Sequence, residues 1–227
     1  MVINFTNLQL AAKAAIQTWA LREEEISKQT LTVITITEDF LRGWLGYWGL
    51  ARSNPRSLRA PLAEGLNDKV RPILIDSVMS DLPSQIPLLA KMLHESGATR
   101  GIQTSLVSKF AFCLRPEMIV PYDQHAKRAL KIAYETQITD HDYETYYELF
   151  LRLQTSVSNE LEASGISKRL EEFWTPKMSK TLFEARTADK FLMLLGGFSV
   201  DAMQRDLEKY FPKKLESSSS VLKELNN

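Results

Sequence analysis

An apolar run at residues 106–114 restricts the fold of this chain more than any other segment. Drawn as a helix, its apolar side chains surround most of the circumference, and Ser108 and Lys109 occupy the only polar sector. A helix that is apolar nearly all round is a buried one. Pro116 cannot continue the helix, and Pro121 fixes the approach to the next one. The sequence therefore predicts a central helix and a well-defined turn into a second helix.

The composition is that of a helix-rich globular protein. The 227 residues are 44% hydrophobic and 25% charged, and strong helix formers fill most of the periodic segments. We find no internal repeat and no linker rich in Pro, Gly or Ser that would divide the body. We expect one all-α, multi-helix domain over residues 1–214, followed by a flexible serine-rich tail at 215–227.

Charge and rare residues exclude several classes of function. Twenty-eight basic and 28 acidic residues cancel, so any DNA contact has to come from a local patch. One cysteine excludes an internal disulfide and a cysteine-based zinc site, and the three histidines lack metal-ligand spacing. We expect no metal and no cofactor. No window is apolar enough for a membrane span, so we expect a cytoplasmic protein without membrane contact.

The first helices follow from periodicity and caps. Residues 8–19 predict an amphipathic helix that ends near the acidic triplet 23–25. The run Thr30–Thr37 is β-branched apart from one leucine, which favours an extended, unpaired segment or a small strand. Thr37 then has the position of an N-cap for a helix through Trp48.

That helix carries a glycine at every third position. The bare face either lets another backbone pack closely, which we favour, or exposes a flat aromatic edge. The residues concerned are Gly43, Gly46, Gly49, Trp44, Tyr47 and Trp48.

Further along the chain, Asp140 or Asp142 can cap a long helix whose aromatic face, from Tyr143 to Leu153, belongs in the core. Ser199 caps the last helix, with Val200, Met203 and Leu207 on its buried stripe.

The densest basic cluster of the first half follows the tryptophans. Aromatic rings beside arginines suit a nucleic-acid surface, although a solvated arginine-rich connection has the same composition. We therefore consider a set of DNA-contacting residues and a set of base-stacking rings. They are Arg52, Arg56, Arg59 and Arg100 for the phosphates, and Trp44, Trp48 and Tyr122 for the bases.

Lys109 and Asp123 are the candidate catalytic residues. Lys109 is bordered by Phe112 and Cys113, so its pKa should fall, as in amine nucleophiles, unless it reaches the surface or pairs with an acid. Asp123 is placed to cap the second helix, and capping alone would explain it. Lys127, Arg128 and Lys131 form a basic stripe opposite that helix's buried side, suited to a phosphate backbone.

The order Ser108-Lys109, Pro116 and Tyr122-Asp123 resembles the helix-hairpin-helix DNA glycosylases, particularly the bacterial 8-oxoguanine-glycosylase-like proteins. The resemblance covers about 30 residues. It implies that Asp123 stabilises charge developing on the sugar and that Lys109 attacks the sugar carbon to form a Schiff base. The family's phosphate-binding hairpin is replaced here by Gly97–Gly101, the lysine and aspartate are closer in sequence, and iron–sulfur cysteines are absent.

We therefore expect a DNA-binding protein that excises a damaged base, with DNA as its partner. The alternative is a non-catalytic helical protein that keeps this fold to bind DNA or another protein, for example in host defence or as a phage countermeasure. The number of copies that assemble does not follow from the sequence.

Overall fold

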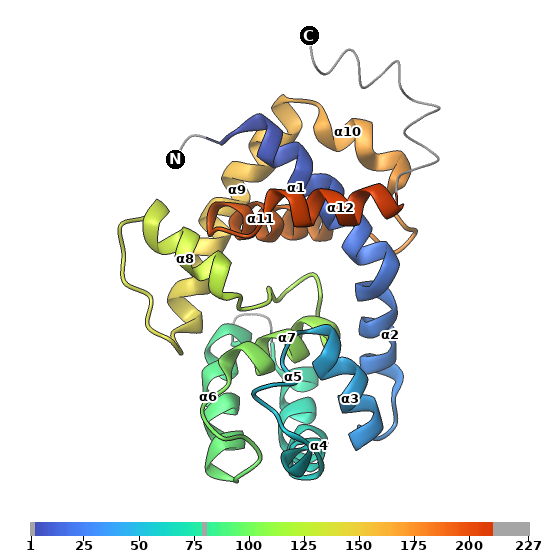
Figure 1. Ribbon diagram of the computed structural model, residues 1–227. Helices are drawn as coiled ribbons and strands as arrows, with labels where there is room; N and C mark the ends of the chain where they lie inside the picture. Colours follow the sequence, from blue (N-terminus) through green and yellow to red (C-terminus); the bar gives the residue numbers. More distant parts are fainter. Residues whose placement is uncertain (1–2, 79–80, 211–227) are drawn as a thin grey trace.

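A computed structural model describes residues 3–78 and 81–210, and these are helical with no strand. The helices form two groups, one above the other in Figure 1, and α2 runs along the edge of both. The prediction of a single all-α domain is confirmed. The predicted tail at 215–227 lies outside the described residues.

One long helical path opens the chain. α1 (Phe5–Thr18) passes through a π-helical turn (Trp19–Glu23) directly into α2 (Glu24–Thr32), so the helix does not end at the acidic triplet. The expected extended segment is correspondingly shorter. The hydroxyls of Thr30 and Thr32 donate to carbonyls one turn earlier, which keeps these β-branched residues helical.

The lower group is built from short helices around α7. Thr37 caps α3, because its hydroxyl accepts the Phe40 amide at 3.2 Å. α2 and α6 pack against the two sides of α7, which explains why an all-round apolar helix is buried there. The helices of this group are α3 (Glu38–Tyr47), α4 (Arg59–Gly65), α5 (Arg71–Asp76), α6 (Leu82–Glu95) and α7 (Thr104–Leu114).

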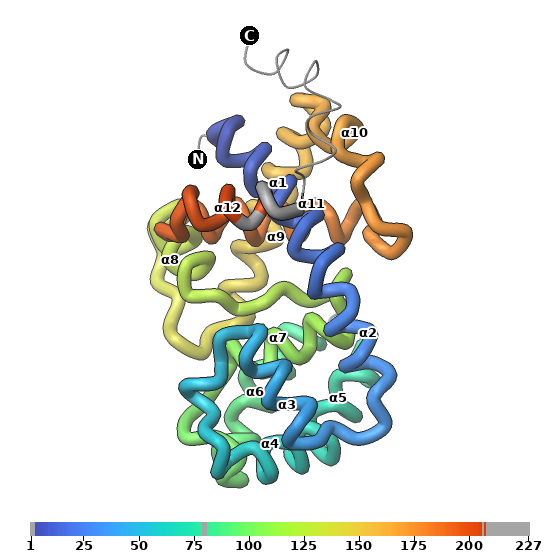
Figure 2. The backbone as a smooth tube through the Cα atoms, turned by 45° about the vertical axis from the view of Figure 1, so that its right-hand side comes forward, coloured from blue at the N-terminus to red at the C-terminus, as the bar shows by residue number. Residues whose placement is uncertain are grey.

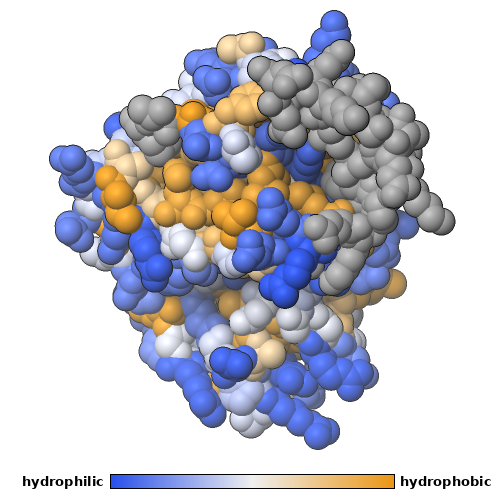
Figure 3. Space-filling view, turned by 45° about the horizontal axis from the view of Figure 1, so that its top comes forward, coloured by the Kyte–Doolittle hydropathy of each residue, from blue (hydrophilic) through white to orange (hydrophobic). Residues whose placement is uncertain are grey.

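The upper group is assembled around α11, which packs on α1, α8 and α9. Asp142 caps α9 by accepting the Thr145 amide, and Ser199 caps α12, as predicted. Val200 is 41% exposed rather than buried. Figure 3 shows a broad apolar patch on the upper part of the face turned towards the reader. The helices are α8 (Gln124–Ala133), α9 (Tyr143–Ala163), α10 (Ile166–Leu170), α11 (Lys180–Leu195) and α12 (Val200–Tyr210).

The connection from α7 to α8 runs between the two groups (Figure 2) and is held by tyrosines of α9. The hydroxyls of Tyr143, Tyr146 and Tyr147 donate to the carbonyls of Val120, Pro121 and Met118 at 2.7–3.0 Å. The aromatic face of α9 lies largely in the core, as predicted, and its hydroxyls satisfy backbone groups that would otherwise be buried unpaired.

Candidate active site

Lys109 lies near the middle of α7 and is almost completely buried, with 8% of its surface exposed. Its Nζ donates to the carbonyl oxygen of Trp48 at 3.3 Å and lies 5.8 Å from the centroid of that indole. Burial lowers the pKa of the Lys109 amine, and the opposing effects of Asp123 and Asp189 are smaller. The predicted loss of hydration at Lys109 and the predicted fall of its pKa are both found.

Asp123 caps α8. One of its carboxylate oxygens accepts the backbone N–H of His125 at 2.8 Å, as the sequence predicted. The residue before it is fixed to α7, because Ser105 donates to the Tyr122 carbonyl and Ser108 accepts the Tyr122 amide, both at 2.9 Å. Two serines of the lysine helix therefore position the aspartate.

The start of α8 is also docked against the end of α11. A Cβ at Gly196 would lie 1.9 Å from the His125 carbonyl oxygen, so only glycine allows this approach. His125 Nδ1 and the Arg128 guanidinium lie 3.1 and 3.2 Å from the Gly196 carbonyl oxygen. The carboxylate is thus held from α7 and α11 together.

The arrangement combines a desolvated amine with a carboxylate. Asp123 lies close enough to Lys109 to raise its pKa, although less than burial lowers it. A weakly solvated amine within electrostatic reach of a carboxylate suits nucleophilic attack on an electrophilic carbon with stabilisation of the positive charge that develops. Among the described residues, no three His, Cys, Asp or Glu side chains are grouped to hold a metal.

Two of the three predicted stacking rings are not available. Trp44 is 3% exposed and packs against Phe110 with ring centroids 5.9 Å apart. Tyr122 is 1% exposed, contacts the rings of Tyr143 and Tyr146, and donates its hydroxyl to the Thr139 carbonyl. Large apolar rings at these positions fill the core, so the proposal of base stacking is restricted to the half-buried Trp48.

The glycine face of α3 is open rather than closely packed. No atom lies within 4 Å of a Cβ built on Gly43, Gly46 or Gly49, and all three are exposed. The favoured prediction of close packing is wrong, because the aromatic side chains of α3 provide its buried face and leave the glycines outside.

The basic stripe predicted on α8 is interrupted. Lys127 is 4% exposed, forms an ion pair with Asp140 at 2.6 Å and lies 5.5 Å from the Tyr122 ring centroid. It is not free to hold a phosphate, because its ammonium already has a carboxylate partner. Arg128 is exposed and Lys131 half-buried, so these two stay candidates.

The arginines of the lower group remain at the surface. Arg52 and Arg56 are exposed, Arg59 is half-buried at the start of α4, and Arg100 is exposed in the α6–α7 turn. The side-chain amides of Asn54 and Gln103 bond reciprocally at 2.9 and 3.1 Å. This pair ties the loop of Arg52 to the residue before α7, close in sequence to Arg100.

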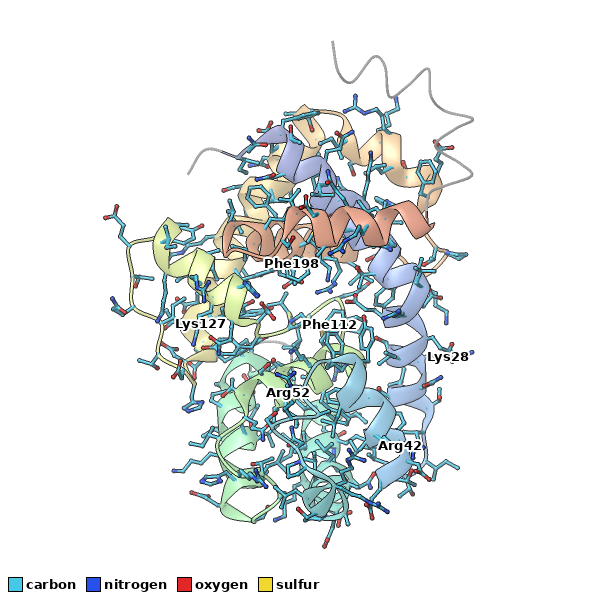
Figure 4. The ribbon with its side chains drawn as sticks, in the orientation of Figure 1. Lys28, Arg42, Arg52, Phe112, Lys127 and Phe198 are labelled. Atoms are coloured by element: carbon cyan, nitrogen blue, oxygen red, sulfur yellow. The ribbon has the colours of Figure 1, made fainter. Side chains whose placement is uncertain are left out.

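A buried charge cluster, which we define as Glu23, Arg186, Asp189 and Lys190, is not among the predicted features. Glu23 comes from the π-helical turn and the other three from α11. Figure 4 shows Phe112, which the Arg186 guanidinium contacts, on the lower side of the junction between the groups, and Phe198 on the upper side. The charged triplet at 23–25 gave only the signal of a solvated helix end, so sequence offered no means of finding the cluster.

Comparisons with protein-family models, with curated proteins and with solved structures found no match to this chain. Within residues 3–78 and 81–210, none of the helices has the length and apolar character needed to cross a bilayer.

Proposed function

We propose that this protein binds DNA and removes a damaged base, with Lys109 as the nucleophile and Asp123 as the stabilising carboxylate. The observation that carries the proposal is the burial of the Lys109 amine, with a lowered pKa, within electrostatic reach of an aspartate that two α7 serines and the end of α11 hold in place. It agrees with the resemblance to helix-hairpin-helix glycosylases around residues 108–123.

The chemistry proceeds from the neutral amine. The lone pair of Lys109 Nζ forms a bond to C1′ of the deoxyribose, while the glycosidic bond breaks and its electron pair leaves with the base, which takes up a proton. The Asp123 carboxylate stabilises the positive charge that develops on the sugar. Loss of the amine proton and opening of the sugar ring then give a Schiff base. A lowered Lys109 pKa favours this path, since an ammonium has no lone pair to donate.

DNA binding is supported by the lower group. Exposed Arg52 and Arg100 flank the start of α7, and the Gln103 side chain does not cap that helix. A helix N-terminus carries partial positive charge and free amide groups, which suit a phosphate. We expect Arg52→Ala and Arg100→Ala each to weaken duplex binding for all sequences. Each should also lower the magnitude of the slope of log binding constant against log salt concentration by about one. The control is Arg152→Ala, an exposed arginine of α9.

The test of catalysis compares two capping aspartates. Asp123→Asn and Asp142→Asn each keep a capping side chain but lose a negative charge at a helix N-terminus, so both should cost only about 0.3–1 kcal/mol of stability. Duplexes with each common base lesion are incubated with both variants and treated with borohydride. We expect Asp123→Asn alone to abolish base release and the reduced adduct. Wild-type protein that releases no base and forms no adduct on any lesion contradicts the proposal.

A second function is favoured by how the polar groups are used. Asp123 caps α8, and the ammonium groups of Lys109 and Lys127 both donate hydrogen bonds within the protein. We propose, as the alternative, a helical protein that binds DNA or a protein partner without catalysis. In that case Asp123→Asn lowers stability and leaves binding intact, and the two aspartate variants behave alike.

A further inference from the structure

A cavity of about 590 Å³ opens beside α2, where the α7–α8 connection begins. It is surrounded by α2, the end of α7, the first residues of the connection, and the segment that leads into α11. Its volume is typical of small-molecule sites, which hold roughly 300–1,000 Å³, and apolar atoms make up most of its lining. None of the residues assigned to catalysis or DNA binding lines it, so its ligand is separate from the proposed base excision.

The π-helical turn between α1 and α2 shapes one wall of this cavity. The Glu24 amide donates to the Trp19 carbonyl five residues earlier, so this turn of the helix contains an extra residue. The extra residue brings Trp19 onto the helix face that carries Glu24 and Leu31, and all three line the cavity. Single π-helical turns inside α-helices are rare and occur frequently at functional sites. The wall is therefore built from a feature that is typical of such sites.

Two donors in the same wall have no partner. Ser27 is 7% exposed and Trp19 is 3% exposed, and neither the serine hydroxyl nor the indole N–H has a hydrogen-bond partner among the described residues. A buried donor without a partner costs free energy, so such groups are few in folded proteins. Rotation about the Cα–Cβ bond of Ser27 turns its hydroxyl between staggered positions. An occupant of the cavity with an oxygen acceptor would satisfy this hydroxyl.

Charged side chains also line the cavity. Lys28 and Lys177 are exposed, and neither ammonium forms an ion pair within residues 3–78 and 81–210. Figure 4 shows Lys28 on α2 at the outer edge of the molecule. Arg115 adds a third positive charge, and Glu24 and Glu117 add two negative ones. The lining is therefore net positive, with two unpaired ammonium groups that can attract an anion.

We propose that this cavity binds a small carboxylate with an apolar body. The carboxylate accepts a hydrogen bond from the Ser27 hydroxyl and is attracted by the ammonium groups of Lys28 and Lys177. The apolar body fills the rest of the cavity against Trp19 and Leu31, where it gains free energy by leaving water. The positive charges match the head of the ligand, and the apolar lining matches its body.

The test uses the full chain and a fluorescent probe. Anilinonaphthalenesulfonate, an aromatic anion that fluoresces in apolar surroundings, is bound to the protein and then displaced by decanoate or by decyltrimethylammonium. The two competitors have hydrocarbon chains of similar length and opposite charge, and both are kept below their critical micelle concentrations. We expect decanoate to displace the probe at a concentration at least about fivefold lower. Equal displacement by the cation, or no binding of the probe and decanoate to wild-type protein, overturns the proposal.

Matched variants locate the binding. Leu31 on α2 and Leu88 on α6 are 53% and 59% exposed, and only Leu31 lines the cavity. Leu31→Trp should weaken decanoate binding at least about tenfold, because the indole occupies the opening, whereas Leu88→Trp should leave it unchanged. Decanoate that binds a folded Leu31→Trp variant as tightly as the wild type occupies another apolar surface, which overturns the proposal.

Polar variants test the head of the ligand. Ser27→Ala should weaken decanoate binding by about two- to tenfold, while the unfolding free energy stays equal or rises, because an unpaired buried hydroxyl is removed. Lys28→Gln and Lys177→Gln should each weaken it by about two- to fivefold, and Lys69→Gln, at an exposed position outside the cavity, should not. Unchanged affinity in all three cavity variants would show that the carboxylate is not recognised here and would overturn the proposal.

Discussion

Two buried lysines on consecutive helices have different electrostatic partners. Lys127 of α8 forms an ion pair with Asp140 at 2.6 Å, whereas Lys109 of α7 donates to a backbone carbonyl. Each lies near an aromatic ring, over Tyr122 and Trp48 respectively, at a similar distance. Lys127 is neutralised at the edge of the protein, but Lys109 is kept where its charge is poorly stabilised.

The difference indicates what each lysine is for. Burying an ammonium without a bonded carboxylate costs free energy, and sequences retain such groups mainly at functional sites. Lys127 fastens α8 to the segment that precedes α9, which is a structural role. Lys109 holds an amine that readily loses its proton, which is the property the proposed nucleophile needs. Substitution of Lys127 should therefore lower the unfolding free energy, whereas substitution of Lys109 should not.

The largest effect on stability is expected for Lys127→Met. The substitution removes an ion pair and an aromatic contact of the buried Lys127 ammonium, while the exposed Asp140 carboxylate keeps its hydration, so we expect a loss in unfolding free energy. Urea denaturation at pH 7 measures it. A loss of similar size for Lys109→Met would contradict the contrast between the two lysines.

Lys109→Met should leave stability unchanged or raise it by about 1 kcal/mol at pH 7, because it removes a poorly compensated buried charge and conserves most of the volume. The effect depends on pH. The folded pKa of Lys109 lies below its unfolded value of 10.5, so the unfolded chain binds more protons between the two. The wild type gains stability as pH rises through this window, and the advantage of methionine disappears towards pH 10.5.

Asp140→Asn should lower stability at pH 7, by an effect that disappears at low pH. A hydrogen bond from Lys127 and its charge hold the Asp140 pKa below the ordinary 3.8. The carboxylate therefore contributes stability above that value, and the contribution is lost as pH falls through the folded pKa. Thermal unfolding of the two proteins from pH 7 to pH 2 should converge. A difference that stays constant with pH would refute the ion pair as its cause.

Cys113 provides a local control for burial around α7, because its alkylation requires no substitution and no change in stability. Burial raises the pKa of its thiol to about 12, so almost no thiolate exists at pH 8. Iodoacetamide should modify the native protein at least about 100-fold more slowly than the urea-unfolded chain. Rapid alkylation without unfolding would show that water reaches this end of α7, and the lowered Lys109 pKa would lose its cause.

Local rules predicted the helices and several caps. Thr37, Asp123, Asp142 and Ser199 cap as expected, because an N-cap needs only a short polar side chain and a following helix. The apolar run on α7 predicted its burial and the lowered pKa of Lys109. These features depend on neighbours within a few residues.

Features that depend on distant partners were not predicted. Glu23 meets Arg186 across 163 positions of sequence, and nothing near Glu23 distinguishes it from a solvated acid. The burial of Lys127 depends on Asp140, which folds back from the segment before α9. Thr30 was assigned to an extended segment on β-propensity, which the packing of α2 on α7 overrides. Helix periodicity predicts which face of a helix is buried, but not which charged residue of a distant segment packs against that face.

The central claim is that the Lys109 amine attacks the sugar. Wild-type protein is incubated with a duplex that contains an abasic site, and the Schiff base is reduced with borohydride. The protein is then digested, and mass spectrometry identifies the modified lysine. We expect the reduced adduct on the peptide that contains Lys109, and its loss in a folded Lys109→Met variant. An adduct carried by Lys190 or by exposed lysines, or one that persists in the Lys109→Met variant, would contradict the claim.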